Sequence, residues 1–492
     1  MNLCLLINHA TRHSETSLLE NLKEYRTMYD PQIVKNPLLK NNLVSRRQLL
    51  KSSGVGFGML GLSALLAEEQ KLAAAVKSTS PLIPKQTHHV PRAKHVIFLF
   101  MNGGPSHVDT FDPKPELKTQ EGKTGKGGKY MPSPFSFSKY GEAGIDMSEL
   151  YPNLGRVADD LCILRGMHTT TPNHEPGLLM MNSGNQQPIR PCLGSWVTYG
   201  LGTENQNLPG FVVLCPGKPV VGPALWGNSF LPGIYQGTHI NNSKVDPKNV
   251  IGHINNKNLS PDAQRRLLDL LQQSNRKHLE KRTADLNLEA RIQSLEVAYG
   301  MQFEAQQAFD ITRESKETLE SYGEGQFANG CLVARRLVER GVRMVQIYYG
   351  SGQPWDAHGN IMDHKRDAGK SDQPIAALIE DLKQRGLLDD TLIIWGGEFG
   401  RTPTAQGKTG RNHHNTGFTT WLCGGGVKGG YVHGATDELG VNAVEGRMDV
   451  HDLHATILHL LGINHEELTF RYSGRDFRLT DVFGNVNHDL IA

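Results

Sequence analysis

Near-continuous apolar runs alternate with amphipathic segments along this chain, and this alternation limits the folds open to it. The runs at 95–101, 342–349 and 391–395 are as apolar as strands that are buried on both faces. The segments 373–385 and 449–461 carry apolar residues at helical spacing. Strands that alternate with helices predict an α/β fold with three layers, in which a mainly parallel central sheet lies between helices.

A charged stretch interrupts this alternation. Ser260 and Pro261 form a typical helix start, and leucines recur at helical spacing beyond them. We predict an inserted helical hairpin within a helical insertion at about 260–340. A coiled-coil partner surface is the alternative, but the heptads are not sustained. Earlier in the chain, the pattern at 147–164 predicts a helix that leads into a strand.

The N-terminal 76 residues have the layout of a twin-arginine export signal. Arg46 and Arg47 precede a weakly apolar, glycine-rich stretch at 54–67, and small residues follow at 73–75, where a peptidase could cut. We therefore expect residues 1–76 to be a leader that engages the twin-arginine export machinery. The stretch is too short and too rich in glycine for a convincing membrane span. Met28 is an alternative start.

This leader implies a periplasmic or secreted protein that is not an integral membrane protein after processing. Residues 77–94 are polar and rich in proline, and we interpret them as a linker. The remaining segment, 95–492, is long enough for one large domain.

Charge and cysteine content argue against two further classes of protein, nucleic-acid binders and proteins built on disulfides or cysteine-bound zinc. The 52 Lys and Arg residues balance 50 Asp and Glu residues, and no basic patch indicates nucleic-acid binding. The odd number of cysteines beyond the leader and the lack of a CxxC motif argue against a disulfide framework or a cysteine-based zinc site. We interpret these cysteines as isolated buried thiols.

Polar residues recur where the predicted strands end, which is where parallel sheets place their working residues. Aspartate, glutamate and histidine side chains in such loops suit zinc, manganese or calcium. The sequence therefore predicts a divalent-metal site near this edge of the sheet. The side chains in these loops include Asn102, Asp109, Asp356, His358, Glu398 and His413.

Several segments resemble the sulfatase and alkaline phosphatase superfamily. LDDTLIIWGGEFGRTP (388–403) resembles a strand and metal-binding loop of that superfamily, and DLHATILHLLGI (452–463) resembles a helix near its C-terminal end. TTPNHEPGLLMMNSG (170–184) resembles the nucleophile segment. With FLFMNGGPSHVDTFDPKP (98–115) and WDAHGN (355–360), the chain is similar to an exported bacterial family of unknown function, DUF 1501, which is usually placed in that superfamily.

The resemblance implies an alkaline phosphatase-like fold and a role for each matched residue. Thr170 falls at the nucleophile position, with Asn173 beside the oxyanion. Six residues match metal-ligand positions: Asn102, Asp109, Asp356, His358, Glu398 and His413, with His414 as a substitute for the last. Arg401, Arg411 and His174 are implied in substrate binding.

The resemblance thus implies a metal-dependent hydrolase of phosphate or sulfate esters, acting on a small-molecule or polysaccharide substrate. Asn102 and Phe399 depart from the superfamily pattern, which places a standard two-metal mechanism in doubt. A formylglycine sulfatase is not expected, since no cysteine stands in the required proline- and arginine-containing motif. The alternative is a non-catalytic envelope protein of the same fold that binds a polysaccharide or a protein partner.

Overall fold

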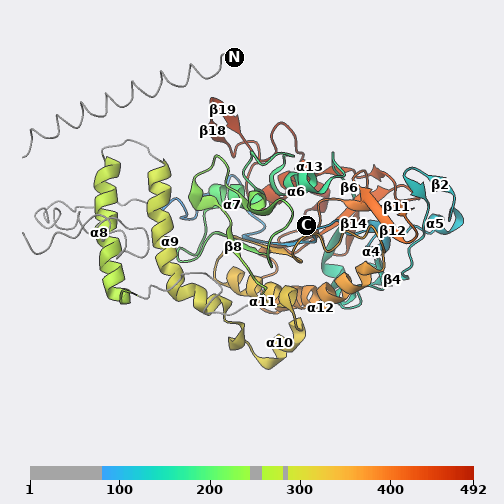
Figure 1. Cartoon of the computed structure of the whole chain (residues 1–492), viewed down its shortest axis with the longest axis horizontal. Coiled ribbons are helices and arrows are strands. Elements are labelled where there is room, and N and C mark those ends of the chain that lie inside the picture. Colours follow the sequence, from blue (N-terminus) through green and yellow to red (C-terminus); the bar gives the residue numbers. More distant parts are fainter. Residues whose placement is uncertain (1–79, 244–257, 281–285) are drawn as a thin grey trace, which may run out of the picture. The chain divides into compact units, whose positions relative to one another are not determined.

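The computed structural model describes residues 80–243, 258–280 and 286–492 (Figure 1). The predicted leader lies outside the described residues, as do residues 77–79 of the predicted linker, whereas residues 80–94 are described. Within the described part, the predicted α/β architecture is confirmed. Figure 1 shows α6, α7 and α13 on one side of a central sheet, with α11 and α12 on the other.

The central sheet has nine strands and is mixed but mainly parallel. Its order is β14-β6-β13-β10-β1-β9-β7-β8, and β17 adds to β6. Only β13, among the paired strands of the described sheet, runs antiparallel to its neighbours. The strands are β1 (His95–Phe100), β6 (Leu161–His168), β7 (Phe211–Leu214), β8 (Thr238–Ile240), β9 (Met344–Tyr348), β10 (Thr391–Gly396), β13 (Phe418–Cys423), β14 (Tyr431–His433) and β17 (Met448–Asp449).

The centre of the sheet is formed by the strands that the apolar runs predicted. Every residue of β1 and β10 is buried, and the two strands pair in parallel from His95 with Thr391 to Phe100 with Gly396. Burial of each large apolar side chain contributes roughly 1.5–3 kcal/mol. This pairing brings the loops that follow the two strands to the same edge of the sheet, as the sequence predicted for Asn102 and Glu398.

The helices cover both faces of the sheet. Helix α11 packs against α12 and β9, and α7 packs against β7 and β9. The helices of eight or more residues are α6 (His174–Ser183), α7 (Leu193–Leu201), α8 (Pro261–Glu280), α9 (Leu286–Phe309), α11 (Gln326–Glu339), α12 (Asp363–Gln384) and α13 (Val450–Leu460). The shorter helices are α4 (His107–Thr110), α5 (Glu116–Thr119) and α10 (Lys316–Tyr322).

The predicted helical hairpin corresponds to α8 and α9, which pack against each other. The Ser260 hydroxyl accepts a hydrogen bond from the backbone N–H of Ala263, and Pro261 begins α8. Helix α9 also contacts α11, which joins the insertion to the sheet domain. None of the helices in the described part of the chain has the length and apolar character that a bilayer crossing requires.

Two sequence predictions need correction. The segment 147–164, predicted as a helix that leads into a strand, does lead into the strand β6, but the helix before it is only a 3-10 helix at Leu154–Asp160, and residues 147–148 end a short strand, β5 (Ile145–Ser148). The helix predicted at 373–385 begins ten residues earlier, at Asp363, and Pro374 lies inside it. The prediction of isolated thiols is confirmed, since the five described cysteines are buried and unpaired.

Short two-stranded sheets decorate this core. The hairpin of β11 (Gly400–Gln406) and β12 (Gly410–His414) lies directly after the β10 loop. The other pairs are β2 (Thr124–Gly125) with β3 (Gly128–Lys129), β4 (Phe137–Tyr140) with β5, β15 (Ala435–Thr436) with β16 (Ala443–Glu445), and β18 (Phe470–Tyr472) with β19 (Arg475–Phe477).

A candidate metal centre

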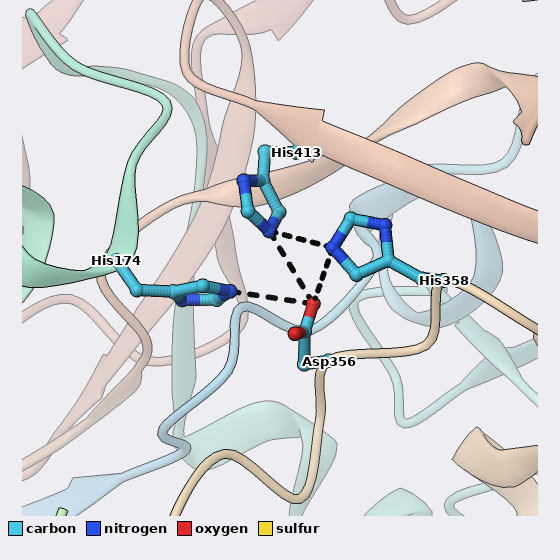
Figure 2. Close-up of side chains that lie close together, drawn as sticks. All are labelled: His174, Asp356, His358 and His413. Carbon is cyan, nitrogen blue, oxygen red and sulfur yellow. Dashed lines mark hydrogen bonds and ion pairs between the residues drawn. The ribbon is translucent and has the colours of Figure 1, made fainter. Parts of the chain in front are cut away.

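Four side chains from distant parts of the sequence converge at one edge of the central sheet (Figure 2). His174 begins α6, Asp356 and His358 lie in the loop after β9, and His413 lies in β12. One ligand atom from each residue lies within 4.8 Å of the others. The structure therefore brings together three residues predicted as ligands, and adds His174, which the sequence resemblance implied in substrate binding.

Four of the six distances between ligand atoms of this cluster are close to those of a small tetrahedral ligand cage. The Oδ1 atom of Asp356 lies 3.3 Å from Nε2 of His174, 3.0 Å from Nε2 of His358 and 3.4 Å from Nε2 of His413. The Nε2 atoms of His358 and His413 are 2.8 Å apart. Ligands about 2.0–2.1 Å from a tetrahedral zinc ion stand ~3.3 Å from one another. These four separations, from 2.8 to 3.4 Å, lie near that value.

Hydrogen bonds on the far side of two rings decide which nitrogen faces the cluster. The Nδ1–H of His174 donates to Oε1 of Glu398 over 2.6 Å, and the Nδ1–H of His358 donates to Oε1 of Gln406. A neutral imidazole that carries its proton on Nδ1 has a lone pair on Nε2. Both Nε2 lone pairs therefore face the cluster, as a metal requires.

The cluster passes a chemical test for a bound cation. Nε2 of His174 and Oδ1 of Asp356 are buried and face each other over 3.3 Å, and Oδ1 also contacts the guanidinium of Arg401. A lone pair that faces a carboxylate oxygen is repelled unless a proton or a cation lies between them. The residues present thus fit a divalent cation, with three imidazole nitrogens and one carboxylate as donors.

The charge state of Asp356 suits this role. Burial raises the pKa of its carboxyl, but contacts with His174, His413 and Arg401 outweigh burial and bring the pKa well below its usual range. Asp356 is therefore ionised at neutral pH. Burial lowers the pKa of His413, so this ring is neutral and its nitrogen can act as a ligand.

His174 responds to the same surroundings in the opposite way. Burial lowers the pKa of its imidazole, but hydrogen bonding with Asp356 and Glu398 outweighs burial, so the pKa is raised. Without a cation, His174 is the group that takes up a proton beside Asp356. A proton and a metal ion compete for the same nitrogen.

Glu398 supports the cluster from behind His174. Its carboxylate is fully buried and accepts a hydrogen bond from the backbone N–H of Gly103, with both oxygens 3.0 and 3.2 Å away. Its oxygen Oε1 faces Nδ1 of His174, which is the nitrogen turned away from the cluster. The structure therefore places this predicted ligand outside the cluster, as the hydrogen-bond partner of His174.

Arg401 lies behind Asp356. The guanidinium is fully buried, and its Nη2 is 2.5 Å from Oδ1 of Asp356. It also donates hydrogen bonds to the carbonyl oxygens of Gly103 and Gly104. Through these contacts Arg401 holds Asp356 in place, whereas the sequence resemblance implied a role for Arg401 in substrate binding.

Three other predicted site residues lie in contacts outside the cluster. The Nδ2 of Asn102 donates to the carbonyl oxygens of Gly350 and Gly352 over 3.0 and 2.5 Å. Asp109 and Arg411 form a fully buried ion pair, with 2.6 Å between Oδ2 and Nε. Arg411 and Asp109 thus neutralise each other inside the protein.

The predicted nucleophile and oxyanion residues, Thr170 and Asn173, lie just before His174 in the sequence. Thr170 is exposed, and its hydroxyl oxygen accepts a hydrogen bond of 2.8 Å from Nε2 of Gln186. Asn173 is exposed as the N-cap residue of α6, and its backbone N–H donates to the Thr171 hydroxyl. His414, the substitute for His413, is turned away and bonds the carbonyl oxygen of Val441.

Two contributors were not identified from the sequence. Gln406 was not singled out, although the glycines at 407 and 410 indicate a tight turn that would return the chain to the site. Phe399 was noted only as a departure from a pattern. Its buried ring lies 4.9 Å, centroid to centroid, from both His174 and His413, and forms an apolar wall beside the cluster.

Comparison with known proteins adds context to this geometry. No curated protein matches the sequence. A sulfatase from Pseudoalteromonas sp. is similar in structure, with 14% identity over 76% of this chain and 69% of that one and a TM-score of 0.33. The TAB5 alkaline phosphatase, as a histidine-to-glutamate variant with magnesium, shows 12% identity over 77% of this chain and 100% of that one, with a TM-score of 0.33.

A protein of the alkaline phosphatase superfamily from Vibrio parahaemolyticus gives a similar result. It is 11% identical over 83% of this chain and 76% of that one, with a TM-score of 0.33. A family model matches far more of the sequence than any motif does, since it spans residues 93–491. The chain belongs to that family, DUF1501, whose description is a protein of unknown function.

Proposed function

We propose that this protein is an exported metal-dependent hydrolase of phosphate or sulfate esters. The observation that carries the proposal is the convergence of three imidazole nitrogens on one oxygen of Asp356. The buried Nε2 of His174, which faces Oδ1 of Asp356 over 3.3 Å, supports a cation site at this cluster.

Zinc suits the cluster better than calcium or manganese. Three imidazoles and one carboxylate at tetrahedral spacing are typical zinc donors, whereas calcium takes six to eight oxygen ligands. His174, Asp356, His358 and His413 would hold the ion. When bound, it would act as a Lewis acid that stabilises negative charge on an ester oxygen.

The chain's own residues would supply the remaining chemistry. We assign Thr170 as the nucleophile on the resemblance of its segment, and Asn173 as an amide donor to an ester oxygen. The Thr170 oxygen accepts a hydrogen bond from Gln186, so its own O–H remains available to a base. We likewise propose the substrate class, a small-molecule or polysaccharide ester, on the basis of the sequence resemblance.

Export remains part of this proposal. Arg46 and Arg47 with the following weakly apolar stretch support a twin-arginine route to the periplasm or the medium. Because that route carries folded proteins, the centre would already be assembled before translocation.

Metal content and turnover together test the proposal. Protein purified without chelators should carry stoichiometric zinc, and Asp356→Ala should lose most of it. Asp363→Ala is the matched control, since Asp363 is an exposed carboxylate in the first turn of α12. Thr170→Ala should keep the metal but lose turnover of aryl phosphate, phosphodiester or sulfate esters, whereas Thr170→Ser retains a hydroxyl and should retain activity.

A second candidate is a non-catalytic envelope protein of the same fold that binds a polysaccharide or protein partner. The observation in its favour concerns Asn102, which stands where the superfamily resemblance implies an acidic ligand. Its side-chain amide instead donates hydrogen bonds to two backbone carbonyl oxygens. Stoichiometric metal in a protein that turns over none of the ester classes, with Thr170→Ala indistinguishable from the parent, would favour this candidate.

A further inference from the structure

The loop that carries His358 lies beside the β11–β12 hairpin and is bound to it by backbone hydrogen bonds, much as a third strand would be. The backbone N–H of Arg411 donates to the carbonyl oxygen of Ala357 over 3.1 Å, and the N–H of Ile361 donates to that of Thr409 over 2.8 Å. Between these two bonds, the His358 side chain lies over the hairpin. The position of this ligand therefore depends on the hairpin.

Gln406 fixes the ring of His358 from the last residue of β11. Its Oε1 accepts the Nδ1–H of His358, so the lone pair of that ring is on Nε2. Nε2 then faces Oδ1 of Asp356 at 3.0 Å and Nε2 of His413 at 2.8 Å. Without the acceptor at Gln406, the ring could carry its proton on either nitrogen.

Gly410 permits the close approach of the two segments. A Cβ atom at this position would stand only 1.7 Å from the carbonyl oxygen of His358 and 2.3 Å from its carbonyl carbon. Both of these are backbone atoms, so relief requires movement of the loop itself rather than of a flexible side chain. Any residue other than glycine must push His358 away from the hairpin.

We propose that Gln406 and Gly410 are the positioning residues for His358: together they hold its imidazole with Nδ1 protonated and Nε2 turned to Asp356. The inference rests on the metal centre of the proposed function. Neither residue is a ligand, so the effect on metal binding acts entirely through His358. Outer partners of metal-bound histidines typically change metal affinity by about 10- to 100-fold.

The chain offers a matched control for each substitution. Gly359 adjoins His358 in the same loop, and a Cβ there meets no atom within 4 Å. Gly359→Ala therefore adds a methyl group next to the ligand without a clash. For Gln406, Glu is the conservative replacement, because a carboxylate still accepts a hydrogen bond from Nδ1–H, whereas Leu accepts none.

Zinc titration of the full-length protein measures the effect. Gly410→Ala and Gln406→Leu should each weaken zinc binding by at least about tenfold. Gly359→Ala should bind as the parent does, and Gln406→Glu should bind at least as tightly as the parent, because its carboxylate still accepts from Nδ1–H. Cobalt substitution gives a second readout, since the visible spectrum of the ion reports a change in its ligand set. Parent-like zinc affinity in both Gly410→Ala and Gln406→Leu would overturn the proposal.

The tautomer of His358 tests the inference separately from metal binding. Nitrogen NMR of the metal-free protein should show His358 protonated on Nδ1, and Gln406→Leu should lose that preference. A parent protein that binds no metal would defeat the proposed function, yet the His358 tautomer would still decide the inference. An Nε2-protonated His358 in the parent would refute it, and a folded Gly410→Ala variant with the parent's His358 signals would remove Gly410 from it.

Discussion

Oε1 of Glu398 accepts a hydrogen bond of 2.6 Å from Nδ1 of His174, on the side of the ring that faces away from the cluster. The carboxylate therefore sets the orientation of a ligand. A carboxylate in this position also makes the histidine a better donor to a metal.

Glu398→Gln should weaken metal binding by about 10- to 100-fold and leave the ligand set intact. The glutamine oxygen can still accept from Nδ1–H, but the negative charge that favours His174 as a donor is lost. Isothermal titration with zinc would check this. Asp363→Asn, which changes an exposed carboxylate, is the control, and equal affinity of Glu398→Gln and the parent would contradict the assignment.

Asn102→Asp should destabilise the protein and should not add a second metal. The amide of Asn102 donates to the carbonyl oxygens of Gly350 and Gly352. A carboxylate has no hydrogen to donate and would face both oxygens, at a cost of roughly 1–3 kcal/mol or more. Urea unfolding gives the stability change, and metal analysis gives the stoichiometry. A variant with two bound ions would show that the position can serve as a ligand site.

Arg411→Met should lower the free energy of unfolding by roughly 3–5 kcal/mol, because it leaves Asp109 buried without its partner. Both side chains of this pair are fully buried. Arg471→Met breaks the exposed pair with Asp476 and should change stability by less than about 1 kcal/mol. Urea midpoints of the two variants, compared at one pH, measure the difference. Similar small effects would mean that Asp109 finds another partner.

The buried His454 should make the fold sensitive to acid. Burial lowers the pKa of this histidine from 6.5 to about 4, and only its Nε2 has a partner, the carbonyl oxygen of Met181. Between these values the unfolded chain binds more protons than the folded protein, so stability falls as the pH decreases.

His454→Gln would remove this contribution while its amide can still donate to Met181. The loss of stability from pH 7 to pH 4.5 should therefore be smaller in His454→Gln than in the parent. Thermal unfolding at several pH values would show it, and parallel curves for the two proteins would refute the assignment.

Export should depend on the arginine pair. Lysine is a poorer match to a site shaped for guanidinium groups, so replacing Arg46 and Arg47 together with lysine should retain the protein in the cytoplasm. Cell fractionation measures the distribution, and a single substitution of Lys51 serves as a charge control. An unchanged periplasmic yield would rule out the twin-arginine route.

The sheet could be predicted because its central strands are buried on both faces. A run such as 391–395 has few alternatives to a central strand, and parallel strands then place the loops after them at one edge. The same reasoning placed Asp356 and His358 near the site. The pattern at 147–164 was harder, since a short strand and a 3-10 turn have weak periodicity of their own.

The roles within the site could not be predicted in the same way. Glu398 and His174 are both metal-binding residue types, and only the side-chain geometry shows that one lies behind the other. Asp109 and Arg411 are 302 residues apart in sequence, so no local pattern announces their pairing. Gln406 is an ordinary polar residue in the sequence, and only the structure shows that its side chain accepts a hydrogen bond from the His358 ring.

The cluster also has a consequence for the order of events in the life of the chain. Its residues come from three segments, and the last, His413, is made 239 residues after His174. No nascent chain shorter than 413 residues holds the complete set. A cation bound by all four residues would therefore be acquired only after His413 has been synthesised and its segment has packed. The compartment in which folding finishes would then select the metal. If the twin-arginine route is used, that selection happens in the cytoplasm, under its tightly limited supply of free metal, before the protein reaches its place of work.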